Sequence, residues 1–100
     1  MRLDLSVAAL ADLQSIADYT LEKWGSEQEE DYLGGIWDSL EKIAVNPSGF
    51  RHRPDLGEGC QSARYRRHVI FFLAKPDRIE VLRVLHGAMD FGSHLPEDLF

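Results

Sequence analysis

Hydrophobic and polar residues follow two different periods along the chain. Residues 2–5 alternate one by one, with Leu3 and Leu5 facing one way, which predicts a short strand. Across residues 7–24 and again across residues 32–44, apolar side chains recur every three or four positions, the spacing of an amphipathic helix. The chain therefore begins with a strand followed by two helices.

The residues at the ends of these helices predict how the helices are joined. Ser6 is placed to cap the first helix through its hydroxyl, and Gly25 is placed to end it. Ser26 and Glu29 have the spacing of a capping box for the second helix, and Pro47 ends that helix. Because the joint is only one or two residues long, we expect an antiparallel helix hairpin.

The second half of the chain has the period of strands. After a connector over residues 46–59, strand patterns cover residues 60–65, 68–74 and 78–86, with a proline-containing turn before the last. The order predicts an α+β fold: an N-terminal strand, an antiparallel helix hairpin, then a three-stranded antiparallel meander forming one sheet. A length of 100 residues fits a single domain over residues 1–100.

Two local patterns leave alternatives open. The strands over residues 68–74 and 78–86 are apolar on both faces, so either the tail from Met89 to Phe100 or a partner protein covers the second face. Gly34-Gly35 lies inside the second helix, where each glycine costs about 1 kcal/mol relative to alanine. The pair indicates either close approach to another helix or to the sheet, or a groove for a partner.

The charge of the chain is unevenly distributed. The formal net charge is -6, which argues against a protein that coats nucleic acid. Residues 1–50 carry three basic and ten acidic residues, a balance of -7, whereas residues 51–100 carry eight and seven, a balance of +1. The stretch 61–68 holds three arginines and no acid, and is either a solvated hairpin or a working surface. No apolar run is long enough to span a bilayer, and we expect a cytoplasmic protein without a membrane anchor.

Few residues have a spacing typical of catalysis or metal binding. The four histidines are scattered, and the single cysteine, Cys60, forms no internal disulfide and is expected to be buried, so we expect no metal and no cofactor. Arg83 projects from an apolar row and needs a partner, either Asp55, Asp77 or Asp90 or an anionic ligand. His86 follows three residues later and is expected on the opposite face of the strand.

Several stretches resemble the ParE-type toxins of the RelE/ParE superfamily. Residues 17–25, ending in Trp24-Gly25, followed by Tyr32-Leu33, are similar to the family's helix hairpin. His68-Val69-Ile70-Phe71-Phe72 resembles its middle strand, and residues 79–90 resemble its last strand. The resemblance covers about residues 3 to 94, and the last strand together with the end of the first helix is its most specific part.

The resemblance implies the toxin of a type II toxin–antitoxin pair. Toxins of this type are understood to poison DNA gyrase without chemistry of their own, and so to block replication. A ParD-type antitoxin would fold along the toxin and neutralise it, and DNA would be contacted only through that antitoxin. No catalytic residue and no cofactor follow from this function.

The resemblance and the surface pattern together suggest two sets of site residues. For antitoxin binding we expect the aromatic and apolar residues Trp24, Tyr32, Ile36, Trp37 and Leu40. For target binding we expect the basic residues Arg64, Arg67, His68, Arg83 and His86. The competing interpretation of Ile36 and Trp37 is that both belong to the core.

The alternative function is ribosome-dependent mRNA cleavage of the RelE type. Arg83 matches the last-strand arginine of those ribonucleases, and His86 stands near their acid–base position. The connector has no lysine, no tyrosine follows Tyr65, and the net charge is unfavourable for docking into a ribosome. Arg66, where the family often has glycine, and Gln61, where arginine is common, are departures that leave the target open. A binding protein without toxicity is a third class.

Overall fold

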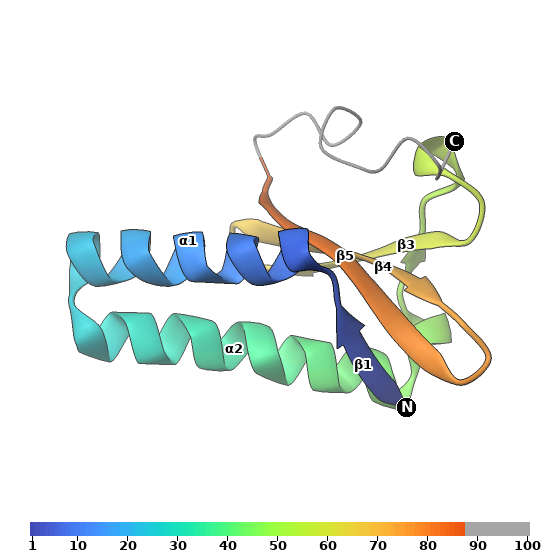
Figure 1. Cartoon of the computed structure of the whole chain (residues 1–100), viewed down its shortest axis with the longest axis horizontal. Helices are drawn as coiled ribbons and strands as arrows, with labels where there is room; N and C mark the ends of the chain where they lie inside the picture. Colours follow the sequence, from blue (N-terminus) through green and yellow to red (C-terminus); the bar gives the residue numbers. More distant parts are fainter. Residues whose placement is uncertain (88–100) are drawn as a thin grey trace.

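A computed structural model describes residues 1–87 as a mixed five-stranded sheet with a helix hairpin packed on one face (Figure 1). Strand β1 covers Arg2–Leu5, and helices α1 and α2 cover Val7–Trp24 and Ser26–Val45. The hairpin runs antiparallel, and its turn end extends beyond the sheet (Figure 1). The predicted order of strand, helix hairpin and sheet is confirmed.

The sheet is assembled from both ends of the described chain. Its order is β1-β5-β4-β3-β2, with β1 parallel to β5 and the other neighbours antiparallel. The other elements are β2 (Arg51–His52), β3 (Cys60–Tyr65), β4 (His68–Ala74) and β5 (Arg78–His86), with short 3₁₀ turns η1 (Pro47–Gly49) and η2 (Pro54–Leu56). The three meander strands have the predicted bounds. The connector, expected to be irregular, contributes the short edge strand β2 and both turns.

The predicted helix ends are confirmed except at the start of α2. The Ser6 hydroxyl accepts the Ala9 N–H at 2.9 Å and caps α1, and its own O–H donates to the Leu82 carbonyl at 2.7 Å. Gly25 has a φ of 92°, which few other residues adopt readily, and it separates the two helices. Helix α2 already begins at Ser26, with Gly25 as its N-cap and no side-chain cap, so the predicted capping box is wrong.

Two apolar clusters lie on the two faces of the sheet. The larger one joins the helices to the sheet through core residues that include Leu13, Ile36 and Phe72. The second contains Val69, Phe71, Leu85, Leu56 and Cys60. The prediction that the strands are apolar on both faces is confirmed. The proposed covering segment, residues 89–100, lies outside the described residues.

An irregularity in β5 changes the faces that simple alternation predicts. Phe71 pairs with Arg83 and Phe72 with Val81, so β5 has one extra residue at this point. Val81 and Val84 consequently share the helix-covered face although they are three residues apart. Leu85, expected on the face of Val81, packs instead in the second cluster.

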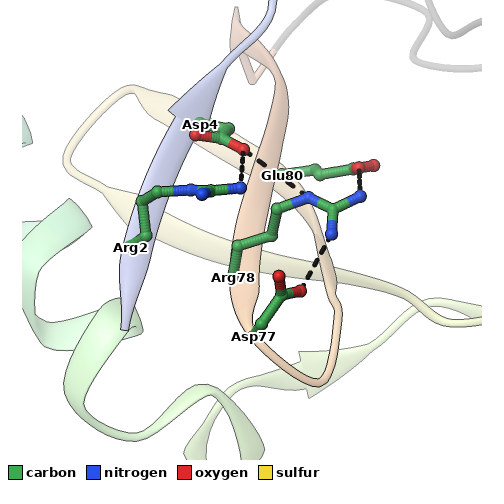
Figure 2. A network of polar contacts seen from close by, with 5 residues as sticks. All are labelled: Arg2, Asp4, Asp77, Arg78 and Glu80. Atoms are coloured by element: carbon green, nitrogen blue, oxygen red, sulfur yellow. Dashed lines mark hydrogen bonds and ion pairs between the residues drawn. The ribbon is translucent and has the colours of Figure 1, made fainter.

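A network of charged side chains joins the first strand to the last (Figure 2). The parallel register places Arg2 beside Arg78 and Asp4 beside Glu80. Asp4 contacts both arginines, at 3.1 and 3.5 Å, and Arg78 also pairs with Glu80 at 2.7 Å. Exposed pairs of this kind contribute about 0 to 1 kcal/mol each, so the network contributes more to register than to stability.

Candidate antitoxin and target surfaces

An exposed apolar stripe runs along α1, and Trp24 is its only member among the antitoxin-binding residues expected from the sequence. Four apolar side chains of the stripe are exposed, namely Val7 (86%), Leu10 (52%), Leu21 (49%) and Trp24 (66%). With the half-buried Ala17 and the exposed Gln14 they occupy positions 7, 10, 14, 17, 21 and 24, which alternate in steps of three and four. This is the a/d spacing with which one helix packs along another. The sequence shows this spacing, but spacing alone does not separate the exposed apolar positions of α1 from those that face the core.

The predicted antitoxin residues on α2 divide into surface and core. Trp37 is 43% exposed, whereas Ile36 and Leu40 are completely buried in the core that joins the hairpin to the sheet. Tyr32 is half-buried, and its hydroxyl forms a 2.7 Å hydrogen bond with Nδ1 of His68. Ile36 and Leu40 are therefore core residues and not the antitoxin contacts expected from the sequence, because a fully covered side chain offers a partner no surface.

The two glycines of α2 have different surroundings. A Cβ on Gly35 would overlap the phenol ring of Tyr65, so close approach of α2 to β3 requires glycine at this position. A Cβ on Gly34 would meet nothing within 4 Å. Both glycines line an open groove of about 410 Å³ whose walls include Asp31, Asp38 and Tyr65. The close-approach interpretation is thus confirmed for Gly35.

A row of rings crosses the end of the sheet next to the β3–β4 turn. Tyr65 pairs in register with His68, and His68 with His86. The His68 ring lies edge-on to His86, with 5.5 Å between centroids, and edge-on to Tyr32 at the same separation. The structure thus brings together two of the predicted target residues, and it adds two tyrosines that the prediction had not grouped with them.

The β3–β4 turn holds an arginine in a strained backbone conformation. Arg66 has a φ of 51°, a region that glycine adopts with less strain and that costs other residues about 1 to 2 kcal/mol. Its guanidinium lies 5.5 Å from the Tyr65 ring centroid and 6.0 Å from that of Tyr32, within the range of cation–π attraction. The Arg66 side chain is thus held beside the two tyrosines although its backbone is strained.

Arg83 has a partner that none of the sequence-based alternatives named. Its Nε and one terminal nitrogen each lie 2.7 Å from the carboxylate oxygens of Asp12 on α1, and the backbone N–H of Val84 donates to the same carboxylate at 2.9 Å. Asp55 pairs with Arg53 and Asp77 with Arg78, so these two candidates are wrong, and Asp90 lies outside the described residues. The ion pair between Asp12 and Arg83 therefore holds α1 against the edge of β5.

Gln61 is a structural residue rather than part of an exposed strip. It is buried, and its side-chain amide donates to the carbonyls of Pro47 and Phe50 at 2.7 and 3.2 Å. These bonds hold the connector against β3. The thiol of Cys60 is buried as expected, and burial raises its pKa above the ordinary value.

Stability is expected to depend on His68 below about pH 6.5. Burial and the neighbouring His86 hold the pKa of His68 below its ordinary value of 6.5, and Asp12 acts in the opposite direction. As the pH falls, the unfolded chain takes up this proton first, so stability that is complete above pH 6.5 is lost below it. Urea unfolding measures the free energy of unfolding at about pH 7.5 and 5.5, and its decrease between the two should be smaller for His68→Gln than for the unmodified chain. Equal losses would contradict this role.

Comparison with known proteins places these features in a family. Residues 3–91 match the family model described as "ParE toxin of type II toxin-antitoxin system, parDE". The chain is 35% identical to Toxin ParE1 of Caulobacter vibrioides over 91 residues, which is 91% of this chain and 94% of that protein. It is 34% identical to Toxin ParE1 of Mycobacterium tuberculosis over 92 residues, with the same shares covered.

The fold agrees with a solved structure of the same kind. A chain from the "Chromosomal ParDE TA system from P. aeruginosa" aligns with a TM-score of 0.72 and 22% sequence identity, over 86% of this chain and 95% of that one. The strand, helix hairpin and mixed sheet thus form an α+β domain with the same fold as that chain. The chain belongs to the ParE toxin family of type II toxin–antitoxin systems.

Neither helix in the part of the chain that the structure describes is long and apolar enough to cross a membrane. Across the same residues, no three His, Cys, Asp or Glu side chains are grouped so that they could hold a metal ion.

Proposed function

We propose that this ParE-family toxin acts in the cytoplasm by inhibiting DNA gyrase, without chemistry of its own, and that a ParD-type antitoxin neutralises it. Family membership supports both parts of the proposal. The observation that favours gyrase over mRNA cleavage is the two-point bond between Arg83 and Asp12. In ribonucleases of the RelE type the last-strand arginine would help to stabilise the phosphorane, and Asp12 already neutralises the arginine at that position of this chain.

The experiment that tests this function compares two targets with one purified protein. We expect the chain to inhibit gyrase supercoiling of plasmid DNA and to leave mRNA intact in a translating extract. Expression alone should arrest growth with DNA-damage signalling, and co-expression of the antitoxin should restore growth. Codon-dependent mRNA cuts would overturn the proposal in favour of a ribonuclease, and harmless expression would favour a binding protein.

The antitoxin surface that we propose is the α1 stripe together with Trp37. Its three- and four-residue spacing fits an amphipathic helix of the partner, packed along α1 with apolar residues toward Leu10, Leu21 and Trp24. The balance of -7 over residues 1–50 favours a partner helix with basic residues beside its apolar side. The turn end of the hairpin, where α1 ends at Trp24, extends beyond the sheet, so the strands do not cover it (Figure 1).

Removing side chains from the stripe is expected to weaken antitoxin binding. Leu21→Ala and Trp24→Ala should each raise the dissociation constant about tenfold or more, because exposed apolar anchors at an interface are often worth over 1 kcal/mol. Tyr19→Ala is the matched control, since Tyr19 is also exposed on α1 but stands off the stripe. Calorimetric titration with the antitoxin measures all three. An effect of Tyr19→Ala equal to that of Trp24→Ala would argue against this surface.

A further inference from the structure

Arginines gather at one end of the sheet, and no carboxylate of residues 1–87 pairs with them. Arg64 ends β3, and Arg66 and Arg67 form the two-residue turn to β4. All three are exposed, and within residues 1–87 none of them forms an ion pair with a carboxylate. Elsewhere in the described chain, Arg2, Arg53, Arg78 and Arg83 each pair with an acid. We call these three arginines, together with the exposed His86 at the end of β5, the basic end of the sheet.

Local contacts fix the positions of these side chains. The Nε of Arg64 donates to the Arg66 carbonyl at 3.0 Å, and the Gly87 N–H donates to the Arg67 carbonyl at 2.8 Å. A Cβ on Gly87 would come within 3.2 Å of the Arg64 guanidinium, so that guanidinium lies across the backbone that follows β5. These contacts hold the turn, the end of β5 and Arg64 together. The hydrogen bond to the Arg66 carbonyl uses the Nε of Arg64 and not its terminal nitrogens.

The conformation of the turn indicates a role for its charge. Glycine would relieve the backbone strain at Arg66, yet the chain carries arginine there, stacked near Tyr65 and Tyr32. Strained backbone of this kind is concentrated at functional positions. Stacking restricts a long, flexible side chain, so less ordering is needed when the guanidinium meets a ligand.

The chemistry of this surface selects the ligand. A guanidinium fork matches the oxygens of phosphate, and arginines are typical of phosphate recognition. The surface is the turn end of β3 and β4, and the neighbouring edge of β5 beyond Val81 already bonds to Ser6 and Asp12 through Leu82 and Val84. An extended acidic peptide would therefore find little free backbone to pair with there. Recognition by charge alone is typical of contacts to the nucleic-acid backbone.

We propose that the basic end of the sheet binds the phosphate backbone of nucleic acid without reading its base sequence. This goes beyond the proposed function and differs from the sequence-based expectation that DNA is contacted only through the antitoxin. It does not depend on which protein the toxin inhibits. The net charge of -6 does not prevent this contact, because charges more than about 8 Å away are largely screened at physiological salt.

The test measures binding of the full chain to a fluorescent DNA duplex of about 20 base pairs over a range of salt concentrations. Three phosphate contacts predict a slope of about -2.7 in log affinity against log salt, so affinity should fall about 40-fold between roughly 50 and 200 mM. Arg64→Gln and Arg67→Gln should each remove one contact and reduce this fall to about 12-fold. Circular dichroism of each variant checks that it is folded.

Arg51→Gln is the matched control, because Arg51 is exposed on the short edge strand β2 and forms no ion pair within the described chain. It should leave the salt slope unchanged. An RNA duplex of the same length should bind with a similar slope, since the backbone charge is shared. The proposal is overturned by absence of DNA binding at about 50 mM salt, by an equal effect of Arg51→Gln, by binding to RNA alone, or by an oligoglutamate peptide that binds more tightly than either duplex.

Discussion

Replacing Asp12 by alanine is expected to lower the free energy of unfolding by about 3 kcal/mol. The Asp12 and Arg83 side chains are only 13 and 21% exposed and meet through two 2.7 Å hydrogen bonds. The substitution leaves the Arg83 guanidinium without this carboxylate in a mostly covered position and removes the acceptor of the Val84 N–H. Urea unfolding at neutral pH measures the loss.

A double-mutant cycle separates the pair from the packing of each side chain. Arg83→Met alone should also destabilise the protein, because it leaves the Asp12 charge partly buried without its partner. The double variant Asp12→Ala/Arg83→Met should be more stable than the sum of the single losses predicts. A loss below about 1 kcal/mol for Asp12→Ala is the size found for exposed ion pairs, and would mean that solvent screens this one too.

Replacing Gly35 by alanine is expected to cost about 2 kcal/mol, although alanine is the better helix former. The added methyl group would overlap the Tyr65 ring, so either the ring must move or α2 must separate from β3. Moving the ring would also disturb its edge-on contact with Tyr32, whose centroid lies 5.3 Å away. Thermal or urea unfolding measures the change.

The neighbouring glycine provides the control. Gly34→Ala meets no atom within 4 Å and should stabilise the protein by up to about 1 kcal/mol through helix propensity. Tyr65→Ala should remove most of the cost of Gly35→Ala in the double variant, because the overlapping ring is gone. If both glycines responded alike, close packing of α2 on β3 would not explain Gly35.

The local part of the fold could be predicted because it depends on neighbouring residues. The period of the apolar positions gives the helices and the three meander strands, and Gly25 gives the end of the first helix. The two-residue strand β2 and the parallel pairing of β1 with β5 depend on contacts between distant segments. The extra residue in β5 likewise depends on pairing with Phe71 and Phe72, so no local sequence pattern predicts it.

The sites were predicted less completely, for the same reason. Exposure cannot be read from hydrophobicity alone, and Ile36 and Trp37 are adjacent in sequence although one is buried and the other 43% exposed. The partner of Arg83 stands 71 residues earlier in the chain, and no spacing rule identifies Asp12 among ten acids in the first half. The arginine cluster was visible because its members are neighbours in sequence.

The pairing of β1 with β5 also sets the order of events during synthesis. Arg2–Leu5 has no strand to pair with until Arg78–His86 has been made, and Ser6 bonds to the carbonyl of Leu82 across 76 residues. At about 5 to 20 residues per second, the first strand waits roughly 4 to 15 s for the last one. The surfaces that β5 helps to form, including the end of the sheet beside the β3–β4 turn, therefore do not exist until the last strand has been translated.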